Sequence, residues 1–197
     1  MNARPAVAIL LEPPRLGVKP RLAEEAGAHH ALRLYRVLAA RTLAAVRALE
    51  LPAVVWFSPI EAQPEMRHWL GPDWELRPQP SGSLGPRLAA AAHGIAPGAP
   101  WIVILSESLG LAPGQLRAAV DALMDYPAVL GPASGAGCYL IGGQRPLPGL
   151  AAGLVEGEPP LPALRHALER LAPGWRELGE LRAIETAADA RAEGLLV

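Results

Sequence analysis

The sequence predicts an α/β protein with a mixed β-sheet, and three features of the chain lead to this fold class. Short apolar runs alternate with segments in which apolar residues recur every three or four positions, as expected for strands joined by amphipathic helices. The runs Ala6 to Leu11 and Trp101 to Leu105 are apolar throughout, which is typical of strands buried on both faces of a parallel sheet. Two further runs, 128–131 and 137–142, lie too close together for a crossover helix, so they are expected to form an antiparallel pair.

The remaining elements are predicted from the same periodicities. Thr186 is a typical amino-terminal cap, so a last helix is expected to run from it through Ala192. Further strands are predicted at 53–57, 74–77 and 181–184, and further helices at 28–50, 65–70, 84–95, 116–124 and 164–171.

Length and composition predict one domain over residues 1–197 and exclude several classes of protein. Apolar residues make up 51% of the chain and the formal net charge is -1, which argues against disorder and against a surface that coats nucleic acid. No segment offers the roughly twenty apolar residues of a membrane span, and the amino terminus lacks a signal-like pattern. We therefore expect a cytoplasmic protein that binds neither nucleic acid nor membranes. The single cysteine, Cys138, excludes an internal disulfide.

The segment after the first strand carries three cations, Arg15, Lys19 and Arg21. Prolines at positions 13, 14 and 20 prevent further strand pairing, and Gly17 permits a tight turn, so the sequence predicts a loop over 12–22. At the carboxyl end of a buried strand, such cations can neutralise a diphosphate. The alternative is that they are solvated surface charges. The loop is not a Walker loop, because it lacks the upstream glycine and the hydroxyl residue after the lysine.

Two further loops follow strands and present polar residues. Small residues around Gly82 lead into a helix that carries Arg87 in its first turn, and free N–H groups at such a helix end attract anions. The alternative there is an ordinary capped helix. Ser106, Glu107 and Ser108 follow the apolar run at 101–105, where open α/β sheets bind ligands. For Glu107 the alternative is a solvated loop residue or a helix cap.

With these motifs in order, the chain resembles a bacterial family with a glycosyltransferase-A (GT-A) type fold. Its members are described as nucleotide-diphospho-sugar transferases or arsenosugar-type glycosyltransferases, distantly similar to molybdenum-cofactor guanylyltransferase. The resemblance runs nearly the full length and implies a three-layer α/β/α, Rossmann-like mixed sheet. It rests on five segments: Pro14-Arg15-Leu16-Gly17 with Lys19 and Arg21-Leu22; Arg77-Pro78-Gln79-Pro80-Ser81-Gly82 with Leu84-Gly85 and Arg87-Leu88; Ile104-Leu105-Ser106-Glu107-Ser108 with Gly110-Leu111; Leu130-Gly131-Pro132-Ala133 with Tyr139-Leu140-Ile141-Gly142; and Ile184-Glu185-Thr186.

The resemblance also implies a site for a nucleotide or nucleotide-sugar. Glu107 would be the ligand of Mg²⁺ or Mn²⁺, which offsets the negative charge that grows on a diphosphate leaving group. Ser106, Ser108 and Tyr139 would contact the substrate. The nucleotide contacts implied are Leu11, Gly17, Lys19, Arg21, Gln79, Gly82 and Arg87.

Departures from the family pattern concern chemistry rather than fold, and they leave two functions open. One is a metal-dependent glycosyl- or nucleotidyltransferase. The other is a catalytically inactive module that binds nucleotides or serves as a scaffold, with a homo-oligomer as one arrangement. The departures are Glu107 and Glu185 in place of aspartates, Ser134-Gly135 in place of an acidic pair, Glu12 in place of a lysine, Pro20 in place of a threonine, and Leu109 in place of a proline.

Overall fold

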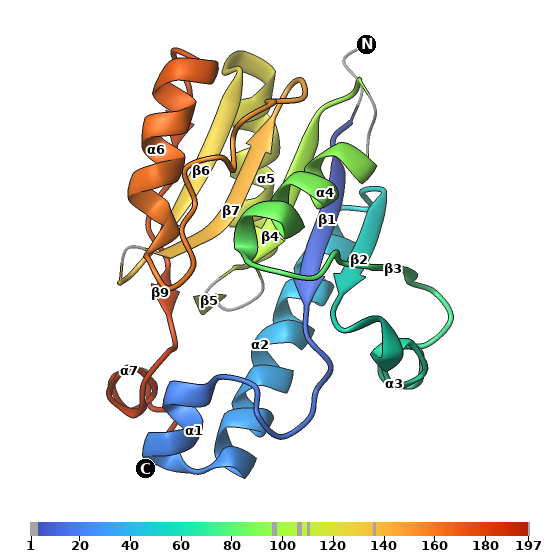
Figure 1. Cartoon of the computed structure of the whole chain (residues 1–197), viewed down its shortest axis with the longest axis vertical. Helices are drawn as coiled ribbons and strands as arrows, with labels where there is room; N and C mark the ends of the chain where they lie inside the picture. The colour runs from blue at the N-terminus through green and yellow to red at the C-terminus, as the bar shows by residue number, and fades with distance from the viewer. Residues whose placement is uncertain (1–3, 96–97, 106–107, 110, 136, 197) are drawn as a thin grey trace.

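A computed structural model of the chain shows a seven-stranded mixed sheet between two layers of helices (Figure 1). The structure describes residues 4–95, 98–105, 108–109, 111–135 and 137–196. The strand order is β3-β2-β1-β4-β7-β6-β8. The first four strands in this order run parallel, whereas β7 is antiparallel to both β4 and β6, which confirms the predicted mixed sheet. The strands are β1 (Ala6–Leu11), β2 (Ala53–Phe57), β3 (Glu75–Pro78), β4 (Trp101–Leu105), β6 (Ala128–Ala133), β7 (Gly137–Gly143) and β8 (Arg176–Glu177).

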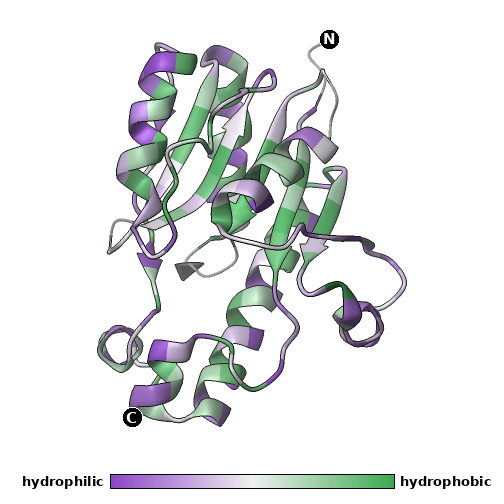
Figure 2. Ribbon diagram, in the orientation of Figure 1, coloured by the Kyte–Doolittle hydropathy of each residue, from purple (hydrophilic) through white to green (hydrophobic). Residues whose placement is uncertain are grey.

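Each face of the sheet is covered by helices, which confirms the three-layer arrangement. Along β1 the side chains alternate between two apolar cores, with Val7 and Ile9 on one face and Ala8 and Leu10 on the other. Figure 2 shows the hydrophobic residues concentrated in the central strands. The first core is completed by α2 (Ala28–Ala48), α3 (Gln63–Leu70, after the short 3-10 helix Ile60–Ala62) and α5 (Pro113–Asp125), and the second by α4 (Leu84–Ile95) and α6 (Pro160–Leu171).

A third, smaller core joins α1 and α2 to the carboxyl-terminal segment of the chain. The helices α1 (Pro20–Ala26) and α7 (Ala187–Ala192) pack on the amino-terminal half of α2 through Leu22, Leu34 and Ala187 (Figure 1). Beside them lies a separate two-stranded sheet, formed by β5 (Ser108–Leu109) and β9 (Arg182–Ala183). None of the helices in the described ranges combines the length and apolarity needed to cross a bilayer.

Two expectations from the sequence differ from the structure. The predicted loop over 12–22 ends at Lys19, because Pro20 begins α1; proline is favoured at the first helical position, where its missing N–H costs no hydrogen bond. The last predicted strand, 181–184, is divided between two partners: Leu181 forms an isolated parallel bridge to Ala133 of β6, and β9 pairs with β5. The edge strand β8 consists of two exposed residues, so it has no apolar pattern from which it could be predicted.

Candidate functional site

A cavity of about 580 Å³ opens where β1 and β4 end. Leu10 and Glu12 line it at the end of β1, and Leu105 lines it at the end of β4. From β1 the chain continues to β2 and β3 on one side of β1, whereas β4 lies on the other side, next to β7 and β6. The cavity therefore lies at a topological switch point. Ligands of open α/β sheets bind at such points. The other lining residues come from α1, α2, α4, the start of α6, the β6–β7 hairpin and the segment 183–189: Arg21, Tyr35, Leu84, Arg87, Ala133, Ser134, Gly135, Gly137, Cys138, Pro160, Ala183, Glu185, Thr186 and Asp189.

Hydrogen bonds from α2 fix the loop that follows β1. The Tyr35 hydroxyl accepts from the Glu12 backbone N–H and donates to the Glu12 carbonyl, both at 2.8 Å. Arg36 Nη2 donates to the Pro14 carbonyl at 3.2 Å. Gly17 has φ +107°, a left-handed conformation that other residues adopt only with strain. The loop therefore delivers Arg21, in the first turn of α1, to the rim of the cavity.

A second arginine reaches the cavity from the first turn of α4. Arg87 is half-buried, and its Nε donates to Oε1 of Gln79. Gln79 follows β3 and is itself buried. Arg87 also lines an adjoining cavity of about 210 Å³, in which the predicted residue Gly82 lies with φ +109°. The structure thus brings Arg21 and Arg87 to one cavity, with Gln79 behind Arg87.

Lys19 lies behind the cavity wall. Its side chain is 0% exposed, and Nζ is 3.4 Å from Oε1 of Glu185, whose side chain is 40% exposed. Glu185 lines the cavity, whereas Lys19 does not. The lysine predicted to contact phosphates is therefore paired with a carboxylate, and the cationic lining of the cavity comes from Arg21 and Arg87.

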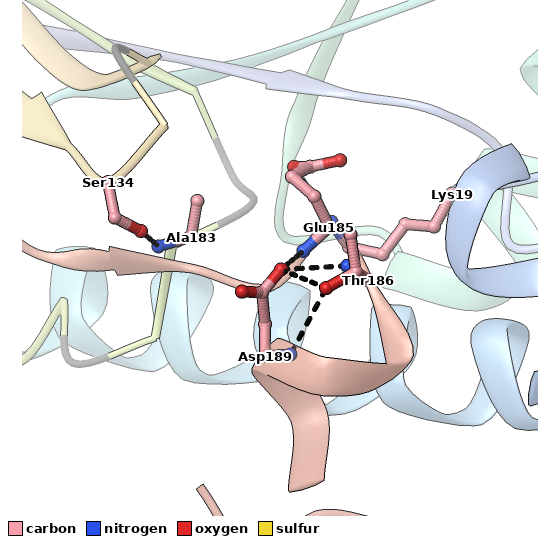
Figure 3. Close-up of polar contacts among 6 residues, drawn as sticks. All are labelled: Lys19, Ser134, Ala183, Glu185, Thr186 and Asp189. Atoms are coloured by element: carbon pink, nitrogen blue, oxygen red, sulfur yellow. Dashed lines mark hydrogen bonds and ion pairs between the residues drawn. The ribbon is translucent and has the colours of Figure 1, made fainter. Parts of the chain in front are cut away.

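The segment 181–189 forms one wall and is held from both sides. On the hairpin side, Ser134 Oγ accepts from the Ala183 N–H at 2.9 Å, as Figure 3 shows. On the other side, the Ala187 N–H donates to Glu25 Oε2 of α1 at 2.8 Å. Asp189 Oδ2 accepts from the backbone of residues 185 and 186 and from the Thr186 hydroxyl, completing a capping box at α7 (Figure 3).

The environment of Asp189 predicts a stability change with pH. Desolvation raises the pKa of the Asp189 carboxyl, but hydrogen bonds from Thr186 and Glu185 and the charge of Arg21 outweigh it, so the pKa lies below its ordinary 3.8. A lowered carboxyl pKa contributes stability that is present above the ordinary value and is lost as pH falls through the lowered one. Asp189→Asn should cost about 1–2 kcal/mol at pH 7. Below about pH 4 its loss of stability with falling pH should be shallower than that of the wild type.

Urea unfolding at several pH values measures this difference. The matched control is Glu177→Gln. Arg165 lowers the pKa of the exposed Glu177 carboxyl, and neither residue lines the cavity. An exposed pair of this kind contributes little to stability, so the control should unfold near the wild-type midpoint at pH 7. Equal losses at pH 7 in both variants would contradict a structural role for the capping box.

Cys138 is the one cavity residue with a thiol, and its environment makes it unreactive. The side chain is buried, and Sγ donates to the Leu140 carbonyl at 3.1 Å. Desolvation raises the pKa of the thiol and outweighs the hydrogen bond to Leu140, which lowers it, so the pKa is about 12. The thiolate is the nucleophilic form, so Cys138 is not a nucleophile at neutral pH.

Comparison with known families identifies the chain. The family model described as "Uncharacterized protein conserved in bacteria (DUF2064)" matches residues 41–154, more than half of the sequence. The chain belongs to this family. None of the curated proteins matches the sequence of this DUF2064 member.

Solved structures confirm the fold that the resemblance implied. The crystal structure of a "putative nucleotide-diphospho-sugar transferase" from Desulfovibrio desulfuricans G20 superposes with a TM-score of 0.87 at 24% identity, covering 98% of this chain and 87% of that one. Rv0371c from Mycobacterium tuberculosis H37Rv, in complex with manganese, gives a TM-score of 0.64 at 18% identity, covering 98% of both chains. CMP:2-keto-3-deoxy-manno-octonic acid synthetase complexed with CTP gives 0.60 at 12% identity, covering 97% of both. This DUF2064 protein therefore has the nucleotide-diphospho-sugar transferase fold.

The remaining predicted residues lie partly outside the cavity. Leu11 is buried, and its carbonyl accepts a hydrogen bond from Gln79. Tyr139 was predicted to contact the substrate, but its ring does not line the cavity: it is 1% exposed in the core on the α2 and α5 side, and its hydroxyl donates to the Gly179 carbonyl at 3.2 Å. Ser106 and Glu107 lie outside the described residues, and for Ser108 the description is limited to its backbone in β5.

The described part of this DUF2064 protein contains no group of three or more His, Cys, Asp or Glu residues that could hold a metal ion. Three carboxylate residues line the cavity, Glu12, Glu185 and Asp189, and carboxylate oxygens are the ligands that Mg²⁺ and Mn²⁺ prefer. Glu185 pairs with Lys19, and Asp189 caps α7. The sequence predicted that Glu185 replaces an aspartate and that Thr186 caps the last helix, but it did not predict that both residues line the cavity.

Proposed function

We propose that the protein binds a nucleotide or nucleotide-sugar in the cavity at the ends of β1 and β4, and that it is a metal-dependent glycosyl- or nucleotidyltransferase. One observation carries the proposal: Arg21 and Arg87, from the first turns of two different helices, line one cavity at the topological switch point. Two guanidinium groups at one cavity suit a diphosphate, because each offers paired N–H donors that match phosphate oxygens.

Each residue of the proposed site would have a role set by its position. Arg21 and Arg87 would bind the diphosphate, assisted by the amino end of α4. The Tyr35 contacts to Glu12 would hold the loop before α1 in place, so that little ordering is needed when the ligand binds. Mg²⁺ or Mn²⁺, held by Glu107, would supply charge stabilisation for the departing diphosphate.

The similar structures support the proposal of a divalent-metal-dependent, nucleotide-binding protein. One of them is described with CTP and another with manganese, and both share the fold with this chain. We extend from them to this chain the class of ligand, a nucleotide, and the class of metal, a divalent cation. A cytoplasmic location belongs to the same proposal, because nucleotide-sugars are made and used inside the cell.

The second candidate is a nucleotide-binding module without catalysis. Two cavity carboxylates that already interact with other residues support this candidate. Asp189 Oδ2 accepts three hydrogen bonds within the α7 cap, and Glu185 pairs with Lys19. Carboxylates that are engaged in this way bind a metal only if they first give up those partners. Under this reading Arg21 and Arg87 still bind the nucleotide.

A thermal-shift panel separates the two candidates. The purified protein is melted with UDP, GDP, CDP, ADP or dTDP, each with and without Mn²⁺, and with the parent nucleosides as controls that lack the diphosphate. At about one hundred times the Kd, a bound diphosphate adds about 2.7 kcal/mol and raises Tm by about 5–10 °C. Mn²⁺-dependent stabilisation supports the transferase, and Mn²⁺-independent stabilisation supports the binding module. Equal shifts with nucleosides and diphosphates, or no shift at all, would contradict both.

A further inference from the structure

We infer that Gln79 is a positioning residue: it aims the Arg87 guanidinium at the cavity and does not itself contact the ligand. The inference rests on the proposed function, since it names how a diphosphate-binding arginine is held. It differs from the sequence prediction, which placed Gln79 among the nucleotide contacts.

Gln79 joins the ends of three parallel strands. It follows β3, and its backbone N–H donates to the Phe57 carbonyl at 2.7 Å, which extends the pairing with β2 by one residue. Its side-chain Nε2 donates to the carbonyls of Trp56 at 2.7 Å and of Leu11 at 3.3 Å. The amide therefore spans from β3 across β2 to the end of β1, at the start of the cation-bearing loop.

These bonds determine which way the amide faces. A glutamine side chain has two N–H donors, and here both have carbonyl acceptors, so the assignment of Nε2 follows from the surrounding backbone. Oε1 must then face the other way, where it accepts from Arg87 Nε. Within the described ranges only Lys19, Thr42 and Gln79 are buried polar or charged residues, and Gln79 is the one whose side chain joins strand ends to a cavity residue.

The hydrogen bond to Gln79 uses Nε of Arg87, so Nη1 and Nη2 remain available to a ligand. No hydrogen bond among the described residues involves Nη1 or Nη2 of Arg87, and Arg87 lines both the main and the adjoining cavity. Fixing Nε restricts the rotation of a long side chain, so less conformational entropy is lost when Nη1 and Nη2 bind an anion. Gln79 thus contributes to affinity through Arg87.

Isothermal titration with inorganic pyrophosphate tests the inference in a double-mutant cycle of Gln79→Met and Arg87→Ala. Methionine has a similar length but lacks the donors and the acceptor. Gln79→Met should weaken pyrophosphate binding about threefold to tenfold, and Arg87→Ala about tenfold to a hundredfold. With Arg87 already replaced, adding Gln79→Met should change the affinity less than about twofold. If Gln79→Met weakens pyrophosphate binding as much in the Arg87→Ala background as in the wild type, the inference is overturned, because Gln79 would then act without Arg87.

The matched control is Gln144→Met. Gln144 Nε2 also donates to a carbonyl, that of Leu123 at 2.8 Å, but it lines a different cavity, together with Pro5 before β1 and Pro100 before β4. Gln144→Met should lower Tm without changing pyrophosphate affinity. If Gln79→Met and Gln144→Met weaken pyrophosphate binding equally, the effect is a general structural one and the inference is overturned.

A second readout does not depend on binding. If the wild type binds no pyrophosphate, the proposed function fails, but NMR hydrogen exchange at Arg87 Nε still tests the positioning. Exchange at this N–H should be slow in the wild type and at least about tenfold faster in Gln79→Met. Equal exchange in the two proteins would overturn the inference.

Discussion

Replacing both Arg21 and Arg87 by glutamine should weaken the binding of nucleoside diphosphates by at least about a hundredfold. A hydrogen bond between a charged donor and a phosphate contributes about 1.5–3 kcal/mol, so losing two such contacts removes about 3 kcal/mol or more. Arg21 is exposed and Arg87 is half-buried, and Arg87 is also held by Gln79. We therefore expect the single replacement of Arg87 to cost more affinity than that of Arg21. Titration calorimetry on the diphosphate that gives the largest thermal shift measures both losses.

The control is a variant with the same change in net charge elsewhere. Arg41 and Arg117 are exposed on α2 and α5 and do not line the cavity. Near 0.15 M salt, charges separated by more than about 8 Å are largely screened, so Arg41→Gln with Arg117→Gln should leave the affinity within about twofold of the wild type. If the two double variants lose affinity equally, the cavity arginines provide only net charge and the proposed site is wrong.

The central sheet could be predicted because its strands are buried on both faces. Between Trp101 and Ile104 every residue is fully buried, so the sequence there has no polar positions and the run is unambiguous. The antiparallel pair β6–β7 was predictable for a different reason, since the five residues between the two predicted strands, 132–136, cannot hold a crossover helix. Both predictions used only local features of the chain, and the mixed sheet follows from them.

The candidate site was only partly predictable, because its decisive contacts join residues far apart in the chain. The sequence shows a cationic loop and a glutamate near the carboxyl end, but not that Lys19 and Glu185 pair across 166 positions. It shows an isolated Gln79, but not that both amide donors find backbone carbonyls, one of them 68 positions away. Which polar groups are used up inside the fold depends on packing, and this decides which ones remain for a ligand.

Gly131→Ala should destabilise the protein by about 2–3 kcal/mol, although it adds a single methyl group. A Cβ at position 131 in β6 would lie 2.3, 2.6 and 2.7 Å from three ring atoms of Tyr139 on the neighbouring strand. The ring cannot easily move aside, because it is buried and its hydroxyl is bonded to the Gly179 carbonyl. Overpacking of this kind forces backbone and side-chain shifts. Urea unfolding should show the loss as a lower midpoint with an unchanged slope.

Gly114→Ala is the matched control, and the opposite sign is expected for it. Apart from its chain neighbours and the backbone of its own helix, nothing lies within 4 Å of the added methyl group in α5. The same substitution should therefore stabilise by about 0.5 kcal/mol, because alanine loses less backbone entropy than glycine in a helix. The cause of the Gly131 effect can be isolated by adding Tyr139→Leu, which removes the ring. In that background Gly131→Ala should cost less than about 1 kcal/mol. An undiminished cost would mean that the β6 backbone itself, rather than the Tyr139 ring, requires glycine at this position.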